Sequence, residues 1–144
     1  MADGITSKTR ILVSERAGYI CEYCRTPSAF STTQFSIEHI IPKSSGGNDD
    51  LDNLAFSCQG CNNIKFTKID ALDAESNQIV SLFNPRIDKW VEHFCWDTEM
   101  IKVIGLTPVG RATVDAIKLN REEVCNLRAI LFLIGEHPPS IGTP

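Results

Sequence analysis

The sequence predicts an α+β protein in which short strands alternate with helices, and three observations support this fold class. The segments 35–42 (FSIEHIIP) and 52–57 (DNLAFS) read as two strands joined by the flexible turn KSSGGNDD. Helical patterns begin the chain and fill its last third. Two CxxC motifs bracket the pair of strands, one before it and one after it.

The first half of the chain should consist of a helix, the two strands and a second helix. Residues 7–20 (SKTRILVSERAGYI) form the first helix, which Ser7 caps and Gly18 ends. Residues 61–68 (CNNIKFTK) follow the second strand as a weak helix by propensity, because Thr67 and the β-branched Ile64 disfavour it. A bound metal would have to hold this helix in place.

The second half should be an extension of this core without a linker. Its helices carry apolar faces that need a partner surface, so we expect the extension to pack on the core. The last helix should have Asn120 as its N-cap. The predicted elements are a strand within 78–86 that Asn84-Pro85 stops, a hairpin at 93–108, and helices at 110–120 and 120–134.

Length, composition and charge limit the number of domains, the cellular location and the partners that we expect. The 144 residues suit one domain, and no apolar run is long enough to span a membrane. The N-terminus lacks the apolar core of a secretory signal, so we expect a cytoplasmic protein, either a monomer or a homodimer. The net charge of −4 argues weakly against a polyanionic partner, because a local basic strip and a bound cation can outweigh it.

Four cysteines form two close pairs, CEYC and CQGC, and two further cysteines stand alone in apolar surroundings. A CxxC turn presents two sulfurs to one ion, so the two turns together supply the tetrahedron that structural Zn²⁺ prefers. Two disulfides or a redox-active dithiol are the alternatives, but the missing signal and the duplicated pair weigh against them. The predicted zinc ligands are Cys21, Cys24, Cys58 and Cys61.

Ionisable and amide side chains line up between the cysteine pairs. Glu38 and His39 lie on the first strand, Asn53 at the start of the second, and Asn62 directly after the last cysteine. In CEYC, EHIIPKSSGGNDDLDNL and CQGCNNIK, residues 16–68 resemble the HNH endonuclease family, in its four-cysteine zinc-containing branch. The segment from LFNPR to GEHPP is similar to an extension found on some bacterial members.

The resemblance implies a ββα-metal nuclease core with a structural zinc and a role for each residue. His39 would be the general base, and Asn53 would brace the loop that aims it. Glu38 and Asn62 would bind the catalytic divalent metal, with Glu38 standing where Asp is commoner and Asn62 making the signature H-N-N. Both departures keep oxygen donors.

The chemistry agrees with these roles without the family name. Hydrolysis of a phosphodiester needs a base that titrates near neutral pH and a cation that offsets developing charge. A carboxylate and an amide oxygen suit Mg²⁺ or Mn²⁺. Lys65 follows Asn62 by one helical turn and could meet a phosphate, although a solvated lysine is as good an interpretation.

The sequence therefore predicts a metal-dependent endonuclease that nicks or cuts DNA with low sequence specificity. The alternative is a non-catalytic zinc-binding module that binds nucleic acid or protein and has no need of Glu38, His39 or Asn62. We expect a nuclease core over 1–68, an extension packed on it over 69–136, and a flexible tail over 137–144. Adjacent strand residues face opposite ways, so we also expect irregular pairing near Glu38.

Overall fold

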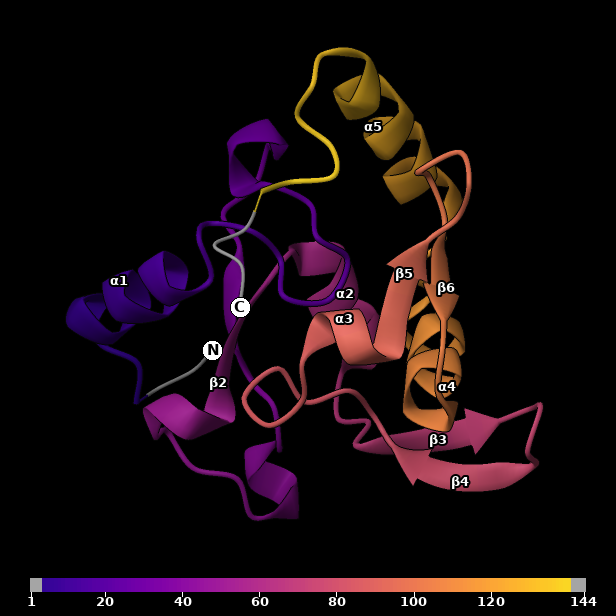
Figure 1. The fold of residues 1–144 in the computed structure, drawn as a ribbon. Coiled ribbons are helices and arrows are strands. Elements are labelled where there is room, and N and C mark those ends of the chain that lie inside the picture. The colour runs from indigo at the N-terminus through magenta and orange to yellow at the C-terminus, as the bar shows by residue number, and fades with distance from the viewer. Residues whose placement is uncertain (1–3, 141–144) are drawn as a thin grey trace.

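The computed structural model describes residues 4–140, and it confirms the α+β class. Within these residues, five α-helices accompany six strands, which pair as three antiparallel two-stranded sheets (Figure 1). Three short 3₁₀-helices lie in the first half of the chain: Ser28–Phe30, Lys43–Ser45 and Leu51–Asn53.

Helix α1 (Ser7–Arg16) begins one residue later than its cap, which is Thr6 rather than the predicted Ser7. The Thr6 Oγ1 accepts a hydrogen bond of 3.1 Å from the Thr9 amide, satisfying one of the free N–H groups of the first turn. Gly18, at a φ of 64°, leads the chain away from the helix into the first cysteine pair.

A hairpin and a helix follow the first cysteine pair. Strand β1 (Ser36–His39) pairs with β2 (Leu54–Ser57), and α2 (Gln59–Lys65) comes directly after them. All four residues of β1 pair in regular register, from Ser36 with Ser57 to His39 with Leu54. The expected irregularity near Glu38 is therefore wrong, and Glu38 and His39 point to opposite faces of the hairpin.

The second half contains the predicted hairpin and two long helices, together with two elements that the sequence did not predict. The unpredicted elements are β3 (Asp70–Asp73), which pairs with β4 (Gln78–Ser81), and the short helix α3 (Trp90–His93). The remaining elements are β5 (Phe94–Trp96), β6 (Val103–Gly105), α4 (Pro108–Ile117) and α5 (Glu122–Leu133).

Asn120 does not cap α5, because its side chain is used elsewhere and Arg121 takes the N-cap position. The Asn120 Oδ1 accepts a bond of 2.7 Å from the Val103 amide, and its Nδ2 donates one of 2.9 Å to the Val103 carbonyl. The residue thus ties β6 to the start of α5.

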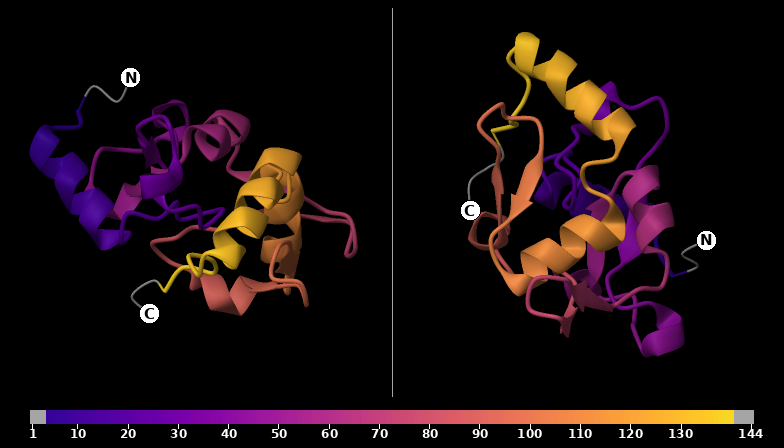
Figure 2. Two further views of the ribbon diagram at one scale, coloured as in Figure 1. Left: turned by 90° about the horizontal axis from the view of Figure 1, so that it is seen from above. Right: turned by 90° about the vertical axis from the view of Figure 1, so that its right-hand side faces the viewer.

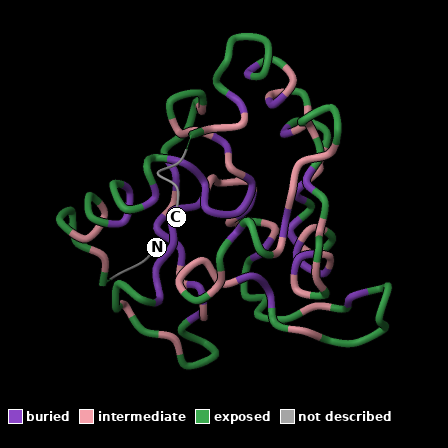
Figure 3. Tube along the Cα trace, viewed as in Figure 1, coloured by how far each residue is buried: buried purple, intermediate pink, exposed green. Residues whose placement is uncertain are grey.

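One buried cluster contains residues from both halves of the chain (Figure 3). Val13 and Leu54 from the first half share it with Phe94 and Ile117 from the second. Helix α4 lies beside α2, as the views in Figure 2 also show. The two halves of the chain therefore share buried contacts, while the division into a core over 1–68 and an extension over 69–136 stays a prediction.

The tail begins as ordered chain rather than as the flexible segment expected from 137 onward. His137 is buried, and its Nε2 lies 2.7 Å from the Met100 carbonyl oxygen. Residues 141–144 lie outside the described part of the chain. None of the helices between residues 4 and 140 has the length and apolarity needed to cross a membrane.

Candidate functional site

The four paired cysteines meet at one point between the hairpin and α2. Their sulfur atoms all lie within 4.8 Å of one another, and the Sγ atoms of Cys24 and Cys58 are 3.7 Å apart. A tetrahedral Zn²⁺ with Zn–S bonds of about 2.3 Å would separate its sulfurs by about 3.8 Å. The donors therefore fit a structural zinc, as the spacing predicted.

Two arginines of the C-terminal region contact this cysteine cluster. Arg121 donates to the sulfurs of Cys58 and Cys61 at 3.5–3.6 Å. The buried Arg128 donates to the Cys24 carbonyl oxygen at 3.2 Å. Four thiolates around Zn²⁺ carry a net charge of −2, so Arg121 offsets part of the charge at the sulfurs. This contact cannot be predicted from local sequence, because the arginine lies 60 residues beyond Cys61.

His39, at the end of β1, pairs with a carboxylate that sequence reasoning missed. Its Nε2 lies 2.6 Å from the Oδ1 of Asp49, and the side chain of His39 is 15% exposed. The Lys43 ammonium donates to the other Asp49 oxygen at 3.1 Å. The hydrogen bonds from His39 and Lys43 lower the pKa of Asp49.

This pairing determines which ring nitrogen of His39 can act as a base. An ionised carboxylate accepts only, so Nε2 carries the proton and donates it to Asp49. The lone pair is then on Nδ1, which makes no hydrogen bond with any described residue. The chemistry available at His39 is therefore proton abstraction by Nδ1 of an imidazole that Asp49 orients.

Asn53 closes the loop between the two strands through its side-chain amide. Its Oδ1 accepts from the Ile41 amide at 2.9 Å, and its Nδ2 donates to the carbonyls of Ile41 and Asn48 at 3.0 and 2.8 Å. The loop that carries Asp49 is thereby fixed to the chain just after His39. These are the loop-backbone bonds that the sequence predicted for Asn53.

Glu38 faces the other side of the hairpin and lies in a buried polar cluster. It is 4% exposed; its Oε1 accepts from the Tyr23 hydroxyl at 2.6 Å, and its Oε2 lies 3.0 Å from the Lys65 Nζ. Lys65 is 1% exposed and also donates to the Ile40 carbonyl at 2.9 Å. Burial raises the pKa of Glu38, while Lys65 and Tyr23 act in the opposite direction.

Lys65 therefore does not lie where a substrate phosphate would meet it. The interpretation from the sequence placed it on the same face of α2 as Asn62. The structure instead turns its side chain inward, onto Glu38. The physical reason is that the buried carboxylate needs a cation nearby, and Lys65 is the cation that α2 supplies.

A catalytic divalent cation does not fit this arrangement of Glu38. Carboxylate and amide oxygens are suitable donors for Mg²⁺ or Mn²⁺. However, the Glu38 carboxylate is enclosed and already paired with an ammonium group, which would repel a second cation. Asn62, the other predicted ligand, is half-buried, and its side chain makes no hydrogen bond with a described residue.

Comparison with known families agrees with this site. Residues 21–68 match the sequence model of the HNH endonuclease family. The match covers about a third of the chain, and we call residues 21–68 the HNH domain after the family that they match. The match begins at the first zinc-type cysteine, ends just after α2, and so contains His39, Asn53 and Asn62. Neither a curated protein nor a solved structure matches the chain.

The HNH domain thus brings together some predicted residues and separates others. The four cysteines form one cluster, and His39 and Asn53 act on the same loop. Glu38 and Lys65 lie apart from His39, on the inner face. Asp49 is the functional candidate that the sequence did not reveal. Acidic residues are common in turns such as Gly-Asn-Asp, and only the folded loop brings Asp49 to His39.

Proposed function

We propose that the chain is an endonuclease that hydrolyses phosphodiester bonds of DNA, with His39 as the general base. The observation that carries this proposal is the His39–Asp49 pair, held by Asn53 within an HNH domain. Nδ1 of His39 would accept the proton of the attacking water, and Asp49 would stabilise the imidazolium that results. The four-cysteine zinc site would fix the hairpin and α2 on which these groups depend.

The proposal includes a ββα-metal core formed by β1, β2 and α2, and dependence on Mg²⁺ or Mn²⁺. Such an ion, when bound, offsets negative charge that develops on the phosphate. We assign it no step, because Glu38 is paired with Lys65, and of the two predicted ligands this leaves Asn62 alone without a side-chain partner among residues 4–140. We expect nicking or cutting with low sequence specificity, since the HNH domain contributes no helix with a row of exposed basic residues.

Plasmid cleavage by the pure protein tests the proposal. Supercoiled DNA is incubated with Mg²⁺, Mn²⁺ or EDTA, beside the His39→Ala variant with its zinc content measured. We expect cleavage that EDTA suppresses and that His39→Ala abolishes while zinc remains bound. If His39→Ala cleaved as well as the parent, the mechanism would be wrong.

The alternative is a zinc module that binds nucleic acid or protein without cleaving it. The closed Glu38–Lys65 pair favours this function, because a binding module does not need an open metal ligand. If the protein bound DNA but left it uncleaved with every metal, the result would support the zinc-module alternative.

A further inference from the structure

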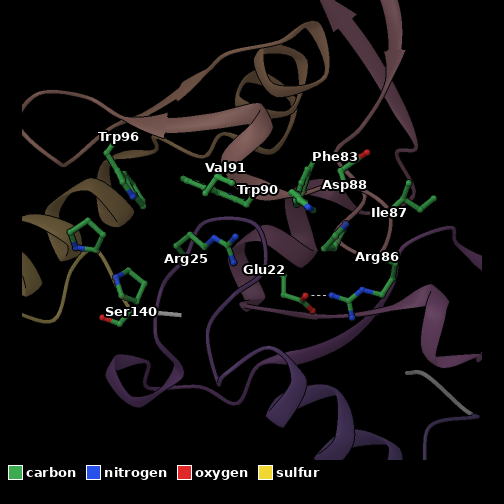
Figure 4. Close-up of a pocket in the computed structure, with 14 residues that line it drawn as sticks. Glu22, Arg25, Phe83, Arg86, Ile87, Asp88, Trp90, Val91, Trp96 and Ser140 are labelled. Atoms are coloured by element: carbon green, nitrogen blue, oxygen red, sulfur yellow. Dashed lines mark hydrogen bonds and ion pairs between the residues drawn. The ribbon is translucent and has the colours of Figure 1, made fainter. Parts of the chain in front are cut away.

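A cavity of about 580 Å³ lies between the first cysteine pair and the segment from Phe83 to Trp96 (Figure 4). This volume is within the range of small-molecule sites. Its lining combines aromatic and cationic side chains, including Arg25, Lys89, Trp90 and Trp96. The residues assigned to catalysis above do not line it.

Arg25 is the central group of this cavity. Its guanidinium lies 4.8 Å from the centre of the Trp90 ring, above its face. Among residues 4–140 its side chain has no hydrogen bond or ion pair, although the residue is half-buried. A guanidinium that is stacked on an indole and lacks an acceptor is available to a planar or anionic ligand.

The nearby carboxylate does not satisfy Arg25, because it is already committed. Glu22 pairs with Arg86 through one oxygen and accepts from the Phe56 amide through the other. The Cys24 sulfur, next to Arg25 in sequence, contacts the Thr26 hydroxyl and the Cys58 sulfur instead. The lining then carries three cations, Arg25, Arg86 and Lys89, against the two carboxylates of Glu22 and Asp88, so a net positive charge remains.

The cavity also adjoins the HNH domain's catalytic strand. A neighbouring cavity of about 440 Å³ shares Phe83, Ile87 and Asp88 with it and extends to Ile40 and Ile41. These two residues come directly after His39 in the chain. A ligand strand could thus lie across both hollows.

We propose that this cavity binds one unpaired nucleotide of single-stranded DNA. Its base would stack on the outer face of the Arg25 guanidinium, which Trp90 supports from behind, and its phosphate would meet Arg25 and Lys89. A paired base cannot enter such a cavity without leaving its duplex. The choice of DNA as ligand rests on the proposed function, whereas the cavity and its unpaired cation do not.

Intrinsic fluorescence gives a direct test, because both tryptophans of the chain line this cavity. The full-length His39→Ala protein, which should not cleave, is titrated with a short single-stranded oligonucleotide, a blunt hairpin duplex and an abasic oligonucleotide of equal length. We expect saturable quenching by the first and at least tenfold weaker binding of the other two.

Variants separate a binding role of Arg25 from a structural one. Arg25→Gln keeps a Cβ at this position, where φ is 67°, so it adds no backbone strain. It should weaken binding at least tenfold and reduce the slope of log K against log salt by about 0.7. Lys8→Gln, which removes one exposed charge from α1, should change neither.

Equal binding of the abasic strand would show phosphate binding alone and overturn the stacking proposal. Absence of quenching, or unchanged affinity in Arg25→Gln, would overturn the site itself. Both results are independent of plasmid cleavage, so failure of this inference is distinguishable from failure of the proposed nuclease activity.

Discussion

Replacement of Lys65 by Met should destabilise the protein strongly, because it leaves a buried carboxylate without its cation. The Lys65 Nζ lies 3.0 Å from Glu38 Oε2, and the two residues are 1% and 4% exposed. Met has a similar length and an apolar chain, so the lost volume is small. After the substitution, the carboxylate would keep only the hydrogen bond from the Tyr23 hydroxyl.

The expected cost follows from what is known of buried ion pairs. Removing one partner of such a pair costs about 3–5 kcal/mol. The free energy of unfolding of a domain is about 5–15 kcal/mol, so Lys65→Met should remove a large part of it. Urea unfolding at saturating zinc, followed by circular dichroism, measures this. Lys68→Met is the control, because Lys68 is exposed, and it should shift the free energy of unfolding by less than about 0.5 kcal/mol.

A double variant tests whether the unpaired charge is the cause. Glu38→Gln in the Lys65→Met background removes the buried charge and should recover part of the lost stability. Lys65→Met with the parent's stability would refute the reasoning, and so would a double variant no more stable than the single one.

Other parts of the molecule give further expected outcomes. Asn53→Ala should lower kcat about 10²-fold with zinc content unchanged, because the loop shifts; unaltered nicking rates would contradict this. Asp49→Asn should lower kcat by a similar factor while DNA binding persists, and an equal loss of binding would point to a structural role. Removal of zinc by a chelator should unfold the chain, and a persistent far-ultraviolet spectrum would exclude that coupling. Arg111 holds the pKa of Asp73 well below its usual range. This pair stabilises the fold above about pH 4 and loses its effect as pH falls further, so the melting temperatures of parent and Arg111→Gln should differ at pH 7 and converge in acid.

The sequence predicted the features that depend on short-range spacing. The CxxC turns placed four sulfurs at one point, and Asn53 bonds the loop as expected, because both follow from local chain geometry. Helical spacing also predicted that Lys65 lies one turn after Asn62 on α2. It could not show which way the side chain points, since that depends on the buried Glu38 of a different element.

The features that the sequence missed depend on contacts between distant segments. Asp49 meets His39 only after the loop folds back, and its Asn-Asp surroundings are typical of any turn. Strand β3, with the sequence DALD, has little apolar content and is ordered by its pairing with β4. Asn120 has the residue type of a helix cap, yet β6 uses both ends of its amide.

The arginine contacts with the cysteine cluster bear on how the segment 21–68 can be moved between proteins. The segment that matches the family model carries all four cysteines and His39, but Arg121 and Arg128 reach it from the opposite end of the chain. A chimaera built from residues 21–68 alone would inherit the ligands without these two donors. Recombination that preserves this site must therefore preserve two arginines that no alignment of the family segment would include.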